Sequence, residues 1–352
     1  MKKQRASIVM ALLLTGCGGG SSSHISQVSD SEPLYYQQWY IDQNDTFYQQ
    51  HHINREAHIH PGDLLSHYTG KGVKIAVIDN GLDVMHEDLN GAVVSAYDVA
   101  TKTANVSHTF QNGYHGTAVT GIIAARVNGK GIQGIASQSQ IIFLKYKEEM
   151  SDSETIELFN KAVAWGADII NCSWGTYDVS QSVREKIVAL AQHGRGGKGV
   201  LIVFASGNDN QDMGEDESAI PEVIAVGSTN KENERVWYSN YGPYLDVMAP
   251  GGYDVGICTT DPMGNKGIAT SDMDYLLYDD PNMFIGTSAS APIVTGILAL
   301  MLEKNMTLTR IEIENILKNE SDKIGAFDYE NGRNDYYGYG KINLEKLMAA
   351  LH

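Results

Sequence analysis

Apolar runs of strand type alternate with apolar helical runs along most of this 352-residue chain. Residues 73–78 and 199–203 are short, mostly apolar runs with the composition of buried strands, whereas residues 118–125, 292–302 and 307–317 have a helical character. Such alternation favours an α/β fold with a mostly parallel sheet. It continues to a last amphipathic helix without an internal linker, so we expect one large domain.

Three residues with complementary chemistry stand at the ends of these runs. Asp79 follows the strand of residues 73–78, at the sheet edge where open α/β proteins place their ligands. His115 opens one helix, and Ser288 opens another beside unpaired backbone N–H groups. Singly, His115 could be a structural histidine and Ser288 a helix cap. Together they predict a catalytic triad, because a serine nucleophile needs a base and the base needs an orienting carboxylate.

Asn208 supplies a fourth element of the same chemistry. It follows the strand run of residues 199–203, and its amide could donate a hydrogen bond to an oxyanion formed at Ser288. Asn after Gly is otherwise a turn signal. The order Asp79, His115, Ser288 along the chain is that of subtilisin, and it differs from the order in chymotrypsin and in α/β-hydrolases.

Seven short stretches carry a wider resemblance. They are IDNG at 78–81, HGT at 115–117, NCSWG at 171–175, SGN at 206–208, VIAVG at 223–227, DVMAPG at 246–251 and GTS at 286–288. The chain resembles the subtilisin-like serine proteases over nearly all its length after the first thirty residues. The resemblance implies a three-layer fold with a mostly parallel central sheet flanked by helices, and serine endopeptidase activity on polypeptides.

The resemblance also assigns roles around the triad. Ser173, Trp174 and Gly175 would bind the substrate backbone as an added strand, and Asn208 would complete the oxyanion hole. No catalytic metal is implied.

Within this family the chain leans toward the kexin and furin branch, through residues 286–305 and 32–40. That branch cuts after basic residues, and Asp178 stands where its acid meets the arginine. A solvated loop acid is the alternative for Asp178. Further acids follow Asn208 in a loop too divergent to align singly, namely Asp212, Asp216 and Glu217.

Two departures weaken the kexin-like interpretation. Asn80 replaces a second acid beside the catalytic aspartate, which puts selection for paired basic residues in doubt, so a broad-specificity subtilisin-like protease remains the alternative. Asn240 replaces a glutamate that helps to hold a calcium ion near the specificity pocket in that branch.

Another calcium site of the family is better matched. Glu32, Asp88 and Asn128, the last within the loop of residues 127–133, stand at its ligand-bearing positions. Carboxylate and carbonyl oxygens are the ligands that calcium takes. The resemblance therefore implies a structural calcium ion, although a shortened loop could also close on itself.

The amino terminus predicts export. Lys2, Lys3 and Arg5 precede the apolar residues 8–14, and Leu-Thr-Gly-Cys at 14–17 resembles the bacterial lipoprotein box. This run is too short to remain as a spanning helix. We expect a signal peptide over residues 1–16, a lipid-modified Cys17 with a Gly/Ser tether over 17–31, and the peptidase domain over 32–352. A plain secreted precursor is the alternative.

This signal implies a place in the cell and a set of partners. Cys17 would anchor the protein in a lipid bilayer of the bacterial cell envelope, and the residue after it favours the outer membrane, on either the periplasmic or the surface face. Removing residues 1–17 changes the formal net charge from −17 to −20. So acidic a surface argues against nucleic acid as a partner and suits cationic peptides.

Three questions stay open at this point. Cys172 and Cys258 could form a disulfide or remain free thiols. A folding pro-domain is not evident, which suggests a separate folding chaperone or calcium as a helper. A catalytically silent peptide-binding lipoprotein is the functional alternative from another class, although all four catalytic positions are filled.

Overall fold

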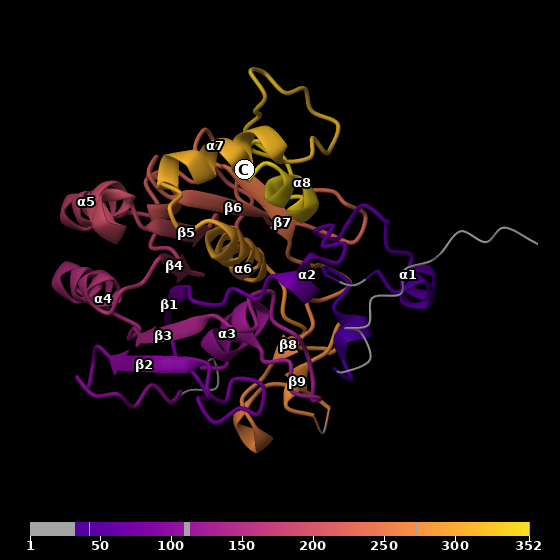
Figure 1. Cartoon of the computed structure of the whole chain (residues 1–352), viewed down its shortest axis with the longest axis horizontal. Coiled ribbons are helices and arrows are strands. Elements are labelled where there is room, and N and C mark those ends of the chain that lie inside the picture. Colours follow the sequence, from indigo (N-terminus) through magenta and orange to yellow (C-terminus); the bar gives the residue numbers. More distant parts are fainter. Residues whose placement is uncertain (1–31, 42, 109–112, 272, 352) are drawn as a thin grey trace, which may run out of the picture.

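A seven-stranded parallel sheet forms the centre of the molecule. The computed structural model describes residues 32–41, 43–108, 113–271 and 273–351, so the predicted signal peptide, Cys17 and tether lie outside the described residues. The strand order is β2-β3-β1-β4-β5-β6-β7, and all neighbouring strands are parallel (Figure 1). The strands are β1 (Lys74–Asp79), β2 (Val93–Asp98), β3 (Gln140–Lys145), β4 (Ile169–Cys172), β5 (Leu201–Ala205), β6 (Ile224–Thr229) and β7 (Val247–Pro250).

Helices cover both faces of this sheet. The helices α3 (His115–Ala124) and α6 (Thr287–Lys304) pack together on one face, and α4 (Asp152–Ala164) and α5 (Gln181–Gly197) pack together on the other (Figure 1). The predicted three-layer α/β fold is therefore confirmed.

Smaller elements complete the chain. They are η1 (Tyr35–Gln37), α1 (Asp45–His51), α2 (Leu64–His67), η2 (Glu217–Ala219), the antiparallel pair β8 (Thr259–Thr260) and β9 (Tyr275–Leu276), η3 (Gly264–Lys266), α7 (Arg310–Glu320) and α8 (Leu344–Ala349). The helix expected over residues 307–317 begins at Arg310, because Thr309 caps it and forms a capping box with Glu312.

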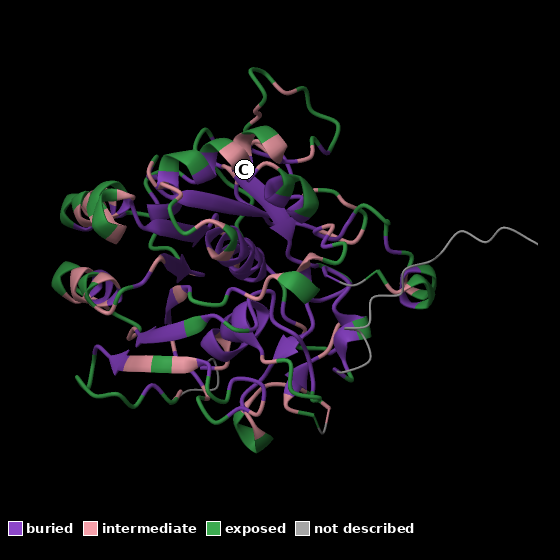
Figure 2. Cartoon of the chain, in the orientation of Figure 1, coloured by how far each residue is buried: buried purple, intermediate pink, exposed green. Residues whose placement is uncertain are grey.

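Alternate residues of each strand enter two different cores. In β1, Ile75 and Val77 pack with α3 and α6, whereas Ala76 and Ile78 pack with α4 and α5. This follows from the period of two along a strand and explains why the runs are apolar throughout. Figure 2 shows α6 buried over most of its length, while α4 and α5 expose their outer faces.

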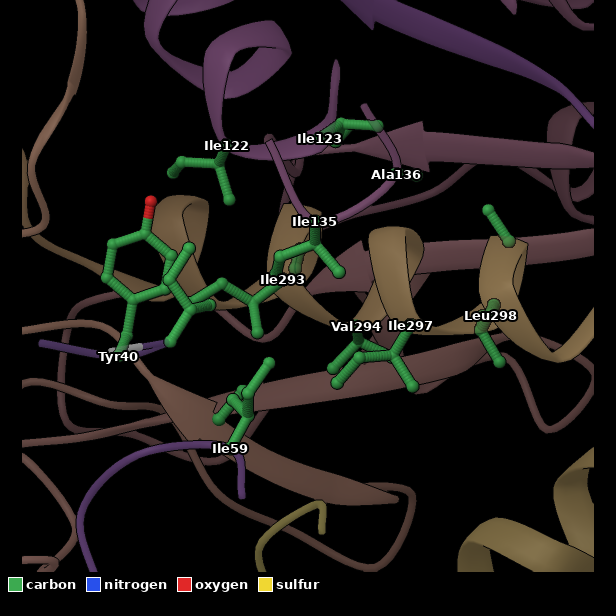
Figure 3. Packing of buried hydrophobic residues seen from close by; sticks show 14 of the residues in the cluster. Tyr40, Ile59, Ile122, Ile123, Ile135, Ala136, Ile293, Val294, Ile297 and Leu298 are labelled. Carbon is green, nitrogen blue, oxygen red and sulfur yellow. The ribbon is translucent and has the colours of Figure 1, made fainter. Parts of the chain in front are cut away.

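The core between α3 and α6 is dense. Ile122 and Ile123 of α3 lie near Ile293 and Ile297 of α6, with Ile135 between the two helices (Figure 3). A Cβ atom built on Gly296 would come within 2.7 Å of Ile135, so only glycine allows α6 to approach this closely. The two helices that carry His115 and Ser288 are thereby fixed against each other.

Two further properties concern the chain as a whole. Cys172 and Cys258 are both buried free thiols, so the disulfide left open by the sequence does not form between them. Among the helices of the described residues, none combines the length and the apolar composition needed to span a membrane.

Candidate active site

The carboxyl edge of the sheet brings Asp79 and His115 together. Asp79 is the last residue of β1 and is fully buried, and His115 is the first residue of α3. The His115 Nδ1 atom lies 2.9 Å from Asp79 Oδ1 and 3.1 Å from Oδ2. A Cβ atom on Gly116 would meet the Gly81 carbonyl oxygen at 2.3 Å, so the glycine allows this close approach.

The charge of Asp79 determines the basicity of His115. Burial alone would lower the pKa of the imidazole, but the Asp79 carboxylate and its hydrogen bond outweigh burial, and the net result is a raised pKa. The side chain of His115 is still 21% exposed, so its other nitrogen can reach a substrate. An oriented imidazole of raised basicity suits a general base.

Ser288 is the second residue of α6 and lies at the same edge. Its hydroxyl donates to the Ser173 carbonyl oxygen at 3.0 Å, and the Ser173 hydroxyl donates in return to the Ser288 carbonyl oxygen at 3.0 Å. Catalytic hydrogen bonds are often looser without substrate than in the reacting complex. The Ser288 hydroxyl is hydrogen-bonded to Ser173 and not to His115, so it would have to turn away from Ser173 before His115 could take its proton.

The Asn208 amide is held in one orientation by the start of α6. Its Oδ1 atom accepts hydrogen bonds from the Thr287 backbone N–H at 2.9 Å and from the Thr287 hydroxyl at 3.0 Å. The oxygen is thereby occupied, and the Nδ2 donor is left for the cavity that Asn208 and Ser288 line together. Thr287, which sequence reasoning did not single out, is therefore the residue that positions this donor.

A cavity of about 200 Å³ adjoins Ser288. It is lined by Ser173, Trp174, Gly175, Tyr177, Ala205, Gly207, Asn208, Asp216, Thr287 and Ser288. The three residues predicted to bind the substrate backbone thus meet the nucleophile and Asn208 in one place. The Trp174 indole donates to the Ile78 carbonyl oxygen at 2.9 Å, which fixes this segment against β1.

The acid that lines this cavity is Asp216, whereas Asp178, the predicted specificity acid, does not line it. Asp178 is exposed and does not line the cavity. Tyr177 has a left-handed backbone with φ of 64°, and beyond it Asp178 forms a backbone bridge with Glu215 on the surface. Asp216 is 5% exposed, and its carboxylate accepts the backbone N–H groups of Tyr177 and Ser218, each at 2.9 Å.

A second carboxyl group stands behind Asp216. Glu217 is 1% exposed and accepts two hydrogen bonds from Thr176, one from its backbone N–H at 3.0 Å and one from its hydroxyl at 2.8 Å. Burial first, and the charge of Asp216 second, raise the pKa of Glu217. Among the described residues no basic side chain forms an ion pair with either acid.

The three residues predicted to bind calcium do come together, but their donor atoms do not fit a calcium ion. Glu32 Oε1 accepts the backbone N–H groups of Asn128 and Gly129 at 2.7 and 2.9 Å, and Oε2 accepts that of Lys130 at 2.9 Å. Asp88 accepts the Asn128 side-chain amide at 3.2 Å. Calcium requires oxygen ligands facing inward, whereas this loop turns N–H groups inward.

The loop has therefore closed on Glu32, which was the alternative left open by the sequence. Asp88 also accepts the backbone N–H of Ile132 at 3.0 Å, and burial raises the pKa of Asp88 to about 7. Within the described part of the chain, no group of three or more His, Cys, Asp and Glu residues is arranged to hold a metal ion.

The Glu32 contacts lead to a prediction about stability. Glu32→Gln should lower the free energy of unfolding by about 2 kcal/mol, because three charge-assisted hydrogen bonds lose their anionic acceptor. Removing calcium with a chelator should change the stability of wild type and Glu32→Gln equally. Thermal and urea unfolding with and without calcium measure both effects, with the exposed Glu148→Gln as the control. If calcium stabilised wild type but not Glu32→Gln, that result would contradict this account.

Asn240 also has a structural task in place of metal binding. The Asn240 Oδ1 atom accepts hydrogen bonds from the backbone N–H groups of Asp209 and Gln211 at 2.9 and 3.1 Å. The backbone N–H of Asn240 donates to the Gly207 carbonyl oxygen at 3.0 Å. The asparagine thus holds the loop that follows Asn208. The loop is fixed by an amide at the position where the kexin branch carries a glutamate.

An oriented Asp–His pair, a serine at a helix start and an amide donor define the site of a serine hydrolase. Residues 70–340 match the model of the Subtilase family, and the chain belongs to this family. It is 32% identical over 328 residues to a calcium-dependent protease of Trichormus variabilis, covering 84% of this chain and 48% of the relative. It is 30% identical over 286 residues to a subtilisin of Bacillus pumilus, covering 79% of this chain and 91% of the relative.

A solved structure supports the fold. The serine protease of Aeromonas sobria, in complex with its chaperone, superposes with a TM-score of 0.77 at 20% identity, covering 92% of this chain and 67% of that chain. At this identity the likeness concerns the fold alone. The chain also spans about half the length of the calcium-dependent protease that it matches.

Proposed function

We propose that this protein is a serine endopeptidase that hydrolyses polypeptides through an acyl-enzyme. The observation that carries the proposal is that the hydrogen-bonded pair of Asp79 and His115 lies at the carboxyl edge of the sheet, where Ser288 and Asn208 line one cavity. A catalytically silent peptide binder would not need all four groups in these positions, so that alternative is not favoured.

The proposed reaction follows from this arrangement. His115 takes the proton of Ser288 as Oγ attacks the scissile carbonyl carbon, and Asp79 fixes the imidazole and stabilises its positive charge. The oxyanion receives hydrogen bonds from the Asn208 amide and the Ser288 backbone N–H. The C–N bond then breaks while His115 protonates the leaving amine. Water then attacks the ester carbonyl carbon while His115 takes one of its protons. The bond between the acyl group and Ser288 Oγ breaks, and His115 returns the proton to Oγ.

We further infer a preference for arginine or lysine before the scissile bond. The support is the Asp216 carboxylate, which is buried in the cavity beside Ser288 and has no basic partner among the described residues. A substrate guanidinium or ammonium would supply the missing counter-ion. Asn80, which is not acidic, leaves no support for a strict paired-basic rule.

The test measures initial rates on peptides that differ only in Arg, Leu or Phe before the scissile bond. Wild type should prefer Arg by about a hundredfold, which is about 2.7 kcal/mol of differential transition-state binding. Asp216→Asn should reduce this ratio to a few-fold. Asp178→Asn is the matched control and should leave it unchanged. Equal cleavage of all three peptides by wild type would instead identify a broad-specificity subtilisin-like protease.

Partners and location extend the proposal. The Aeromonas sobria protease was solved with a chaperone, and we propose that this chain likewise folds with a separate helper protein. Spontaneous refolding of residues 24–352 to an active enzyme, without calcium or a partner, would contradict this.

We also propose attachment to the bacterial envelope through a lipid on Cys17, on the strength of the sequence alone. Metabolic labelling with a fatty acid, lost in Cys17→Ser, tests the anchor.

Calcium enters the proposal through the relatives. The Trichormus variabilis relative is named a calcium-dependent protease, and we infer that calcium stabilises this fold, at a site other than the loop closed by Glu32. Calcium would then act on the folded state and not on the triad chemistry. Calcium titration followed by unfolding, in wild type and Glu32→Gln, tests both parts of this inference.

A further inference from the structure

A second cavity lies at the end of α3 that is remote from His115. It has a volume of about 420 Å³ and is formed by α2 and the segments that follow α2 and α3. Because α3 has ten residues, its two ends are about 15 Å apart. The cavity shares no lining residue with the one beside Ser288, so it is a separate site. The lining residues that determine its chemistry are Leu65, Thr69, Arg126, Val127 and Gln133.

Arg126 supplies the positive charge of this cavity. Its Nη1 atom donates to the Ser137 carbonyl oxygen, and Nη2 donates to those of Gly91 at 3.1 Å and Ser139 at 3.0 Å. A guanidinium has five N–H donors, so two remain. Within the described part of the chain no carboxylate forms an ion pair with Arg126, although the formal net charge of the protein is −17. The carbonyl oxygens therefore orient this cation without neutralising it.

Backbone hydrogen bonds hold the walls of the cavity in place. Glu303, near the end of α6, accepts the backbone N–H groups of Thr69 and Gly70 at 2.6 and 2.7 Å, so this acid is engaged by backbone donors. The Thr69 carbonyl oxygen accepts the Gln138 N–H at 2.7 Å, which ties the segment after α2 to the segment that carries Gln138. The cavity is thus formed before any ligand arrives.

Gln133 adds a buried polar group that has no partner. The residue is 1% exposed, and its Oε1 atom makes no hydrogen bond to any described residue. Its backbone is fixed by Gln38, because the Gln133 N–H donates to Gln38 Oε1 and the Gln133 carbonyl oxygen accepts Gln38 Nε2, both at 2.9 Å. A buried amide oxygen without a donor is costly, so a ligand N–H is the group that suits this position.

Apolar surface completes the cavity. Leu65 of α2 is buried, and Val127, the residue after Arg126, is 47% exposed. The cavity therefore combines a cation with N–H donors to spare, an amide acceptor and an aliphatic surface. The C-terminal residue of a peptide matches all three, because it carries a carboxylate, a backbone N–H and a side chain. A guanidinium binds a carboxylate through charge-assisted hydrogen bonds, and aliphatic surface favours an aliphatic side chain.

We propose that this cavity binds the C-terminal residue of a peptide that ends in an aliphatic side chain. Arg126 receives the carboxylate, Gln133 accepts the backbone N–H, and Leu65 and Val127 contact the side chain. The triad takes no part in this binding, so the inference does not depend on the proposed endopeptidase function. It gives the protein a second peptide-binding site at the opposite end of the helix that begins at His115.

The test is calorimetric titration of the purified protein with N-acetyl-L-leucine, which carries the carboxylate, the N–H and an aliphatic side chain. N-acetyl-L-leucinamide lacks the carboxylate, and 4-methylpentanoate lacks the N–H. Each should bind at least about tenfold more weakly than N-acetyl-L-leucine. Equal affinity for 4-methylpentanoate would indicate a site for free carboxylic acids and would overturn the inference. So would equal affinity for the leucinamide, or no saturable binding of N-acetyl-L-leucine up to about 10 mM.

Two variants locate the bound ligand. Arg126→Gln should weaken binding of N-acetyl-L-leucine at least about tenfold, whereas Arg55→Gln, which removes an exposed arginine elsewhere, should leave it unchanged. Because Arg126 also holds three carbonyl oxygens, Gln133→Met supplies a test that does not disturb them.

Methionine keeps the approximate shape of Gln133, and the amide oxygen that it removes has no partner among the described residues, so the fold should survive. In Gln133→Met the preference for N-acetyl-L-leucine over 4-methylpentanoate should disappear. Wild-type affinity for N-acetyl-L-leucine in both Arg126→Gln and Gln133→Met would place the ligand elsewhere, for instance at the active site, and would overturn the inference.

Discussion

Ser288→Ala should abolish peptide cleavage, with a fall in kcat of about 10⁶-fold. We take this magnitude from subtilisin, where loss of the nucleophile costs about as much as loss of the whole triad. Without Oγ no acyl-enzyme forms, and His115 and Asp79 have no nucleophile to activate. Initial rates on an Arg-containing peptide, measured at enzyme concentrations high enough to detect slow turnover, check the expectation.

The fold should survive this substitution. Among the described residues Ser288 Oγ makes a single hydrogen bond, to the Ser173 carbonyl oxygen, and the cost of losing it should be about 1 kcal/mol or less. Equal melting temperatures for the two proteins would therefore assign the lost activity to chemistry. Retention of more than about one thousandth of the wild-type rate by Ser288→Ala would contradict the proposed role of Ser288.

Asn208→Ala should lower kcat by about 10²–10³-fold with little change in KM. The amide donates to an oxyanion that exists only in the transition state, so its loss should not weaken ground-state binding. The magnitude is again the one known for subtilisin. Steady-state kinetics of wild type and Asn208→Ala on the same peptide separate kcat from KM.

A second variant controls for the structural task of this side chain. Asn208 Oδ1 also anchors Thr287 at the start of α6, and truncation removes that anchor together with the donor. Asn208→Asp keeps an oxygen acceptor for Thr287 but removes the N–H donor. Both variants should therefore lose kcat. If Asn208→Asp retained wild-type kcat, Asn208 would be a positioning residue and not the oxyanion donor.

The sequence could place the central residues because strand ends and helix starts fix their positions. A buried parallel strand ends at the carboxyl edge, where Asp79 meets His115 at the start of α3, and Ser288 starts the other helix packed on the same face. The periodicity that identifies these elements is a local property, which explains why the fold could also be predicted.

The sequence pointed to Asp178 as the specificity acid, but loop geometry decides which acid lines the cavity, and that acid is Asp216. Asp178 and Asp216 both follow motif residues in irregular segments, and neither segment has a periodic pattern. The left-handed Tyr177 turns Asp178 toward solvent, while two backbone N–H groups hold Asp216 in the cavity. The sequence showed Asp216 as one of several acids after Asn208, but only the path of the chain shows that it lines the cavity with Ser288.

The calcium loop illustrates a different limit of the sequence. Glu32, Asp88 and Asn128 were correctly expected to meet, because their positions in the chain match a family pattern. The sequence does not show whether the loop directs carbonyl oxygens or N–H groups inward. Here the N–H groups face Glu32, so the same residues hold the loop through hydrogen bonds.

The most direct test of the account is labelling of the folded protein with a fluorophosphonate, followed by intact mass measurement and peptide mapping. A serine activated by His115 and Asp79 should react once, with the adduct on Ser288, and Ser288→Ala should not react. We expect that single adduct together with loss of peptide cleavage. A folded wild-type protein that stays unlabelled, or that carries its adduct on another serine, would contradict the proposed active site.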